Sequence, residues 1–241
     1  MGLERQEEEN RVVANSLLPS MLNELVERNN LVLLKKLKHE INEISFIENT
    51  KKTPLHIAAI NGFFEITEFL ASCNLNINEL DDLHNTALNY ACKYKHYKVA
   101  HFLRSKGGMV NSVNNQLGPY LCTLAYYNDL DSIKLYNECG AEILATDADN
   151  RTLLHIAASE GKTEIIEYLL NNTSIDFNSK DKFGYTPYLN ANKEIKDLFE
   201  NKLGSKLVKN DDLHECNISN KKRKKLAKKK QLNSINEIKI S

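Results

Sequence analysis

The segment TPLHIAAINGFFEITEFL, residues 53–70, decides the fold of this chain. The hydroxyl of Thr53 can cap a helix, and Pro54 suits the first helical position, where a backbone N–H would have no partner. Leu55 and Ala59 share one helical face, and the small alanine lets a neighbouring helix approach closely. This half of the segment therefore predicts a helix buried along one side.

A second helix should follow after a tight turn. Gly62 can adopt the left-handed conformation that ends many helices. After it, Ile66, Phe69 and Leu70 recur at helical spacing and should face inwards. The segment therefore predicts a pair of helices rather than a strand.

The pattern recurs every 33 residues. The leucine column is Leu22, Leu55, Leu88, Leu121 and Leu154; the small column is Val26, Ala59, Cys92, Ala125 and Ala158; the turn column is Asn29, Gly62, Lys95, Asn128 and Gly161. Such a period is typical of stacked repeats and not of a single closed core. Because lysine adopts the left-handed conformation poorly, Lys95 predicts an irregular turn.

The string T-P-L-H-x-A-A at 53–59, with T-L-L-H-I-A-A at 152–158, resembles the ankyrin repeat. The resemblance covers roughly residues 15–203 and implies two antiparallel helices and a protruding loop per unit. It also implies that His56 and His155 bridge neighbouring units by hydrogen bonds. The expected fold class is an all-α ankyrin-repeat solenoid of about five to six units.

This frame divides the chain into an acidic lead-in at 1–14, a repeat domain at 15–203 and a Lys-rich tail at 204–241, which we expect to be disordered. The end units are degenerate, and a one-residue insertion within 171–184 shifts the frame. The expected units lie near 15–52, 53–85, 86–117, 118–150 and 151–185, with a C-terminal cap at 186–203.

Composition argues for a reduced intracellular setting. The chain has 241 residues and five cysteines, and the cysteines lack C-x-x-C spacing, which favours free thiols in a cytoplasmic or nuclear protein. We find no secretory signal and no apolar run long enough to span a membrane. We expect a monomer.

No catalytic, metal or cofactor site is expected. The string Gly161-Lys162-Thr163 looks like the end of a phosphate-binding loop, but residue 156 is Ile where that loop needs glycine. Zinc-protease, paired C-x-x-C and serine-hydrolase motifs are missing as well. These observations favour a protein without enzymatic activity.

The basic run KKRKKLAKKK at 221–230 allows several interpretations. Outside it the chain has 24 basic and 32 acidic residues, a net charge of −8. The run could bind an import receptor, contact nucleic-acid phosphates or be an inert solvated tail. No aromatic residue interrupts it, which disfavours base stacking. The charged residues concerned are Lys221, Lys222, Arg223, Lys224, Lys225, Lys228, Lys229 and Lys230.

A narrower resemblance comes from the order of the irregular units. The stretch 16–37, the unit at 53–70 and the string LCTLAY at 121–126 are similar to the C-terminal ankyrin region of animal cytosolic asparaginase and lysophospholipase-type enzymes. The catalytic lobe of that family carries glycine–threonine motifs, which this sequence lacks. The chain could therefore be the non-catalytic accessory part of an amidohydrolase.

The preferred hypothesis is an adaptor that binds a protein partner on the concave face expected of ankyrin repeats. Tyr94, Tyr127 and Phe183 are the expected anchors, because aromatic side chains dominate interface energies. The full candidate set comprises Ile60, Asn61, Lys93, Tyr94, Tyr127, Ser159 and Glu160 on the inner helices, and Asp81, Asp82, His84, Asn114, Asn115, Asp147, Asp149, Asn150, Lys182 and Phe183 at the loop tips. A nuclear adaptor that uses the basic run is the remaining alternative.

Overall fold

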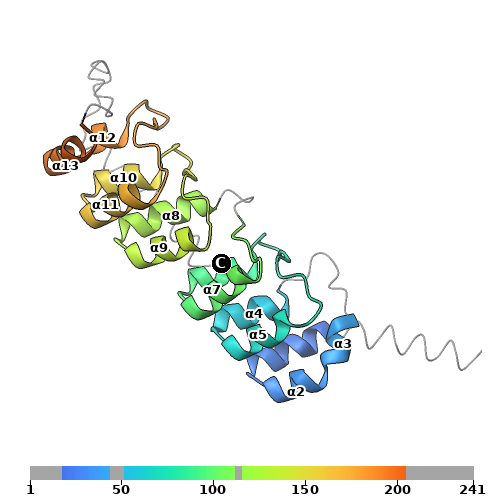
Figure 1. Cartoon of the computed structure of the whole chain (residues 1–241). Coiled ribbons are helices and arrows are strands. Elements are labelled where there is room, and N and C mark those ends of the chain that lie inside the picture. The colour runs from blue at the N-terminus through green and yellow to red at the C-terminus, as the bar shows by residue number, and fades with distance from the viewer. Residues whose placement is uncertain (1–17, 44–51, 112–115, 205–241) are drawn as a thin grey trace, which may run out of the picture. The chain divides into compact units, whose positions relative to one another are not determined.

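The computed structural model describes residues 18–43, 52–111 and 116–204, and in these ranges all regular secondary structure is helical (Figure 1). The all-α expectation is therefore confirmed. Contacts divide the chain into two compact parts. The first part is Met1–Asn114 with Lys134–Glu142, and the second is Asn115–Ile133 with Ile143–Ser241. The acidic lead-in at 1–14 and the tail from 205 onward lie outside the described residues.

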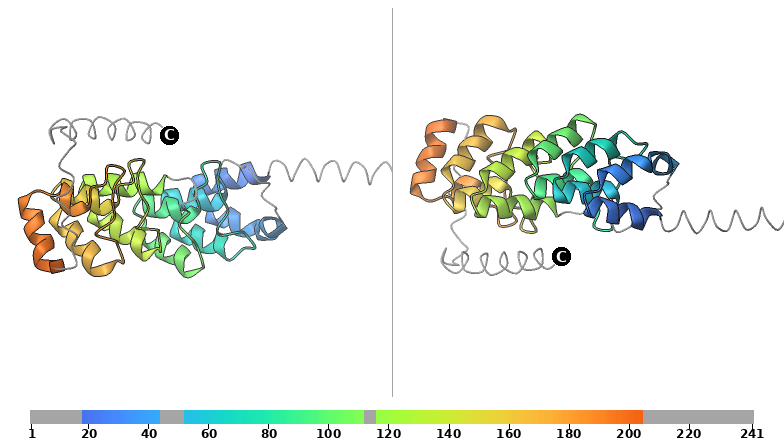
Figure 2. Two further views of the ribbon diagram at one scale, coloured as in Figure 1. Left: turned by 90° about the horizontal axis from the view of Figure 1, so that it is seen from above. Right: turned by 90° about the horizontal axis from the view of Figure 1, so that it is seen from below.

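Most helices of the first part form consecutive pairs of an inner and an outer helix, and α3 (Lys38–Glu43) is an additional short helix after α2 (Leu31–Lys36). The other helices are the one at 18–27, α4 (Pro54–Asn61), α5 (Phe64–Ala71), α6 (Ala87–Lys93) and α7 (Tyr97–Ser105). The inner helices α4 and α6 pack on each other, and the outer helices α5 and α7 do the same. The views from above and below in Figure 2 show α4 and α5 side by side.

The second part repeats this arrangement. It contains α8 (Leu117–Tyr126), α10 (Leu153–Ser159), α11 (Thr163–Asn172), α12 (Pro187–Asn190) and α13 (Lys193–Leu203), while α9 (Leu130–Glu138) has residues in both parts. The inner helix α10 packs against α8, α12 and its own partner α11 (Figure 1). The repeat with the one-residue insertion within 171–184 also has a longer outer helix, because α11 has 10 residues whereas α5 has 8.

The leucine column forms the interior. Leu22, Leu55, Leu88, Leu121 and Leu154 are each at most 3% exposed. Val26, Ala59, Cys92, Ala125 and Ala158 of the small column are fully buried. Since neighbouring inner helices meet at these small residues, a larger side chain there would separate them.

Five turns between an inner and an outer helix contain a left-handed residue, namely Asn29, Gly62, Lys95, Asn128 and Gly161, whereas the turn between α12 and α13 is extended at Ala191 and Asn192. Lys95 has φ 58°, close to the 70° of Gly62. Its amide donates to the Cys92 carbonyl at 3.1 Å, and the next amide, of His96, donates to the Ala91 carbonyl at 2.9 Å. Asn128 and the residue after it make the same two bonds. The predicted irregular turn at Lys95 is wrong, because the bonding pattern forces lysine into the conformation that glycine adopts readily.

The divergent repeat starts its inner helix early. Pro119 occupies the column of Thr53, and α8 begins before it, at Leu117, without a side-chain cap. Gly118 lies against the backbone of Thr146, since an added Cβ would be 2.1 Å from the Thr146 carbonyl oxygen. Glycine at position 118 therefore permits a close approach of helix and loop.

We predict that Leu154→Ala lowers the free energy of unfolding by about 2–5 kcal/mol, because it leaves a cavity at a fully buried position. Leu144→Ala is the matched control, because Leu144 is 46% exposed and should change stability by less than about 0.5 kcal/mol. Urea unfolding followed by circular dichroism measures both. Equal losses in the two variants would contradict the interior position of Leu154.

We also predict that Gly62→Ala destabilises the chain more than Gly161→Ala. Both glycines have φ near 70°, so alanine at either position would incur the same backbone strain of about 1 kcal/mol. At Gly62, however, the new Cβ would lie 2.5 Å from Nδ1 of His96, whereas at Gly161 it would meet only the Asn192 amide nitrogen at 3.5 Å. The difference in urea midpoints tests this, and identical midpoints would show that His96 moves aside freely.

Candidate functional site

A histidine bridge joins neighbouring repeats in the first part. The amide of Thr53 donates to Nδ1 of His56 at 3.1 Å, so this nitrogen accepts and the proton sits on Nε2. Nε2 in turn donates to the carbonyl of Asn85, 2.9 Å away in the next loop. Burial lowers the pKa of His56, which keeps the ring neutral and this hydrogen-bond direction fixed. The bridging role expected from the ankyrin resemblance is confirmed.

The second part contains the same bridge. The amide of Thr152 donates to Nδ1 of His155 at 3.0 Å, and Nε2 lies 3.0 Å from the Tyr185 carbonyl. Burial lowers the pKa of His155 as well. Because both ring nitrogens of each histidine are occupied within the fold, these residues position loops.

Asn89 replaces histidine in the repeat between them. Its side-chain oxygen accepts from the Thr86 amide at 3.2 Å, and its amide group donates to the Asn111 carbonyl at 3.0 Å. Asn89 therefore also joins its cap to a loop without a titratable ring, but its acceptor lies 22 residues along the chain, whereas the acceptors of His56 and His155 lie 29 and 30 residues along. The sequence analysis missed this replacement because asparagine does not belong to the motif.

Aspartates fold the loop tips. The carboxylate of Asp81 accepts from the amides of Leu83 and Asn85 at 3.0 and 2.8 Å, and Asp147 and Asp181 accept from the residues two and four positions on in the same way. Asp81 is only 4% exposed, and its other oxygen accepts from the hydroxyl of Tyr90 at 2.5 Å. Asp81 therefore supports its loop from inside, and the prediction that it faces a partner is wrong.

In the first part, most remaining candidates lie at the surface. Asn61, Asp82, His84 and Tyr94 are exposed, while Ile60 and Lys93 are partly buried. The carbonyl of Ile60 accepts from Nε2 of His96 at 2.9 Å, which brings the ends of two inner helices together. The structure therefore provides a continuous surface along α4 and α6.

Tyr94 is the main exposed aromatic residue of this surface, at 47% exposure. Its ring stacks on that of Tyr90, with centroids 6.4 Å apart and 12° between the planes. Lysines border the pair, because Nζ of Lys52 lies 5.6 Å from the Tyr90 centroid and Nζ of Lys93 lies 6.0 Å from the Tyr94 centroid. Burial raises the pKa of Tyr90, so its hydroxyl stays protonated and donates to Asp81. The exposed ring of Tyr94 therefore packs on the ring of Tyr90, which its hydrogen bond to Asp81 holds in place.

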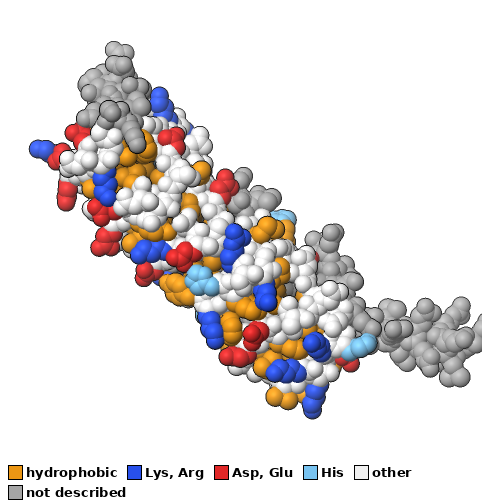
Figure 3. Space-filling view, in the orientation of Figure 1, with side chains coloured by type: hydrophobic (Ala, Val, Ile, Leu, Met, Phe, Trp, Pro, Cys, Tyr) orange, Lys and Arg blue, Asp and Glu red, His pale blue; other side chains and the backbone are white. Residues whose placement is uncertain are grey.

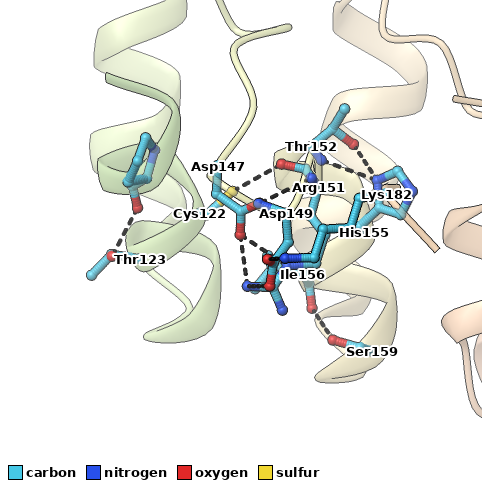
Figure 4. Close-up of polar contacts among 11 residues, drawn as sticks. Cys122, Thr123, Asp147, Asp149, Arg151, Thr152, His155, Ile156, Ser159 and Lys182 are labelled. Carbon is cyan, nitrogen blue, oxygen red and sulfur yellow. Dashed lines mark hydrogen bonds and ion pairs between the residues drawn. The ribbon is translucent and has the colours of Figure 1, made fainter. Parts of the chain in front are cut away.

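In the second part, ion pairs join two loop tips (Figure 4). Lys182 pairs with Asp149 through its ammonium group, and its backbone amide donates to the Asp149 carbonyl at 2.9 Å. Arg151 pairs with Asp147 at 2.6 Å and lies 3.9 Å from Asp149. The predicted candidates Asp147, Asp149 and Lys182 are therefore brought together, and much of their charge is neutralised within the loops.

Other candidates of the second part remain accessible. Tyr127 and Phe183 are 58% and 51% exposed, and Asn150 is exposed with φ 55°. Ser159 and Glu160 are partly buried at the end of α10. The two aromatic rings therefore present the largest contact area of this group.

Some candidates lie outside the described residues, namely Asn114, Asn115 and the basic run at 221–230. Conversely, the sequence analysis did not select Leu80, Leu83, Tyr97 and Leu144, which are 39–46% exposed. A signal was present for Tyr97, since it lies in an aromatic and lysine-rich turn. For the leucines no signal was present, because the interior pattern also contains leucine.

The described residues give no indication of metal chemistry or a membrane span. No group of three or more His, Cys, Asp or Glu side chains in them could hold a metal ion, and none of their helices could cross a bilayer.

Cys73, Cys92, Cys122 and Cys139 are free thiols and buried. Burial raises the pKa of Cys73 and Cys122, and a mutual hydrogen bond raises the pKa of Cys92 and lowers that of Cys139.

Comparison with protein families decides the classification. The model of ankyrin repeats in three copies matches residues 22–114 and 121–200. The chain belongs to the ankyrin-repeat family. The expected fold class, an all-α ankyrin-repeat solenoid, is thereby confirmed. Ankyrin repeats are generally non-catalytic and bind proteins.

Individual ankyrin relatives differ in length. An L-asparaginase of Dirofilaria immitis is 26% identical over 191 residues, 79% of this chain and 32% of the relative, which confirms the narrower resemblance as a similarity. A putative ankyrin repeat protein of Acanthamoeba polyphaga mimivirus is 26% identical over 65% of this chain and 20% of its own length. The mouse 26S proteasome non-ATPase regulatory subunit 10 is 41% identical over 28% of this chain and 29% of its own length. The chain thus spans a third or less of these relatives.

We predict that acid destabilises the chain through its two bridging histidines. Their pKa values are lowered in the folded state, so below the ordinary value of 6.5 the unfolded chain binds more protons than the folded one. This contribution to stability is present above pH 6.5 and is lost as the pH falls below it. Urea midpoints measured on both sides of that pH test the sign.

His155→Asn provides the sharper comparison, because an asparagine at this motif position can bond to the cap amide and to a loop carbonyl without titrating, as Asn89 does. The variant should lose less stability on acidification than the parent. If the parent and His155→Asn respond equally to acid, His155 does not carry the effect.

Proposed function

We propose that the chain is a non-enzymatic adaptor that binds a protein partner with its loop tips and the ends of its inner helices. Ankyrin repeats supply a rigid scaffold whose surface positions can vary without loss of the interior. The bridging histidines and loop aspartates fix that scaffold, which leaves neighbouring surface residues available for contact. A preorganised surface loses little conformational entropy on binding.

The observation that carries the proposal is a pair of exposed tyrosines at one repeat position. Tyr94 and Tyr127 both directly follow an inner helix and are 47% and 58% exposed. The same position holds Asn61 and Glu160 in other repeats, so the fold does not require an aromatic residue there. Exposed aromatic side chains on rigid elements are typical interface anchors.

A second candidate function is the accessory part of a larger amidohydrolase. The observation that favours it is the similarity to an L-asparaginase over 79% of this chain but only 32% of that enzyme. In this proposal the repeats position or regulate a catalytic segment, and they hydrolyse no asparagine themselves.

We expect Tyr94→Ala and Tyr127→Ala each to reduce the recovery of a partner from lysate at least about tenfold, as for interface anchors elsewhere. Affinity capture with mass spectrometry on the tagged full chain measures this. Tyr168→Ala on the outer helix α11 is the control away from these helix ends and should leave recovery unchanged; because Tyr168 is partly buried, the melting temperature of this variant is measured as well. Recovery of the same proteins by all variants would exclude the tyrosines as anchors.

The accessory function has its own test. The transcript that encodes this chain should encode an adjoining segment with a glycine–threonine catalytic motif, and the repeat chain alone should show no asparagine hydrolysis. A transcript without such a segment excludes this second function and leaves the adaptor function intact.

A further inference from the structure

The turn between α6 and α7 has an unusual surface. Its sequence is KYKHYK, residues 93–98, and it exposes Tyr94 by 47% and Tyr97 by 43%. Lys95 and Lys98 are exposed as well. Over α5 and α7, Figure 3 shows Lys and Arg side chains next to hydrophobic ones. Two aromatic rings and several ammonium groups are therefore presented within six residues of chain.

Lys95 is unfavourable for the local backbone. It has φ 58°, whereas the same turn position holds Gly62 with φ 70° and Gly161 with φ 69°. Glycine adopts this conformation without the steric cost that a lysine incurs. The backbone conformation of this turn therefore disfavours a lysine, and a residue that opposes a local preference motivates a functional hypothesis.

Lys98 opposes a second local preference. Among the described outer helices that begin at the same repeat position, three carry an acid in the first turn, namely Glu65, Asp131 and Glu164, whereas α2 and α7 carry none. Acids are favoured there because the helix dipole is positive at its N-terminus. Lys98 instead places a positive charge beside the positive N-terminal end of the α7 dipole. Its Nζ lies 3.7 Å from the centroid of the Phe64 ring, so an aromatic residue holds the ammonium group at the surface.

We propose that the surface formed by Lys93, Tyr94, Lys95, Tyr97 and Lys98 binds an acidic peptide segment of a partner protein. This inference rests on the adaptor function and names the partner's chemistry. Carboxylates would pair with the lysines, and apolar side chains of the peptide would pack on the two tyrosine rings. The unfavourable like charge at the start of α7 is relieved when a carboxylate binds beside it.

Charge complementarity favours a short acidic peptide over a nucleic acid. Outside the run at 221–230 the chain has a net charge of −8, so a long polyanion would be repelled by most of its surface. The lysines of this turn are confined to one helix junction, which matches a few carboxylates and not an extended phosphate backbone.

Fluorescence anisotropy on the full chain tests the proposal with three labelled probes. The first is a peptide of glutamates interspersed with leucines, the second replaces every glutamate by glutamine, and the third is an oligouridine of equal length. The acidic peptide should bind at least about tenfold more tightly than its glutamine counterpart, and added salt should weaken it. Equal binding of the two peptides, or tighter binding of the oligouridine that depends on Lys95 and Lys98, would overturn the proposal.

The decisive variant combines Lys95→Gly with Lys98→Glu, which introduces the residues that the repeats with Gly62 and Gly161 carry. Its melting temperature should change little, because relief of the strain at Lys95 and the acid gained at the helix N-terminus offset the lost contact between Lys98 and Phe64. Acidic-peptide binding should weaken at least about tenfold, and a purely structural role cannot produce this combination. Lys180→Glu with Lys193→Gln lowers the net charge equally at exposed positions and should leave binding unchanged. Equal weakening of acidic-peptide binding in both double variants would show that net charge alone determines the affinity. That result would overturn the assigned site.

Partner capture separates this inference from the adaptor function. If a partner is recovered in a manner that depends on Tyr127 but not on Lys95 and Lys98, the adaptor function stands and the acidic-peptide site is wrong. If no variant alters recovery while the acidic peptide still binds at the turn, the site stands and the proposed anchors are wrong.

Discussion

Burial of the inner helices against one another is the constraint on which the rest of the structure depends. Each inner helix presents a leucine and a small residue, such as Leu154 and Ala158, and both are fully buried only because a neighbouring inner helix covers them. A single repeat could not bury this face, so stability is shared between neighbours. The histidine bridges then fix the loops relative to helices that are already packed.

The residues that follow the repeat period could be predicted from the sequence, because the same local geometry selects the same residue type each time. Thr53, Leu55 and His56 are examples, and the structure places them at the cap, in the interior and at the bridge. Long-range contacts could not be predicted in this way. Asp81 looked like a solvated loop residue, but the hydroxyl of Tyr90, nine positions away, bonds it inside.

The surface was harder to predict than the interior, for a physical reason. Interior positions must satisfy packing, so few residue types fit, whereas a surface position accepts most residues at little cost. The informative surface positions are those where a residue opposes a local preference, as Lys95 does with φ 58°. The candidate set selected by loop position alone therefore mixed exposed residues such as Phe183 with a buried one, Asp81.

The buried thiols have a consequence of their own. Cys73, Cys92, Cys122 and Cys139 are at most 7% exposed and lie in three successive repeats of the described chain, with Cys122 and Cys139 in the same repeat. A thiol-specific reagent can reach each sulfur only when the surrounding helices separate. The rate at which each cysteine becomes labelled therefore reports how often its own repeat opens, and the natural sequence contains the probes needed to map local unfolding without introducing any foreign residue.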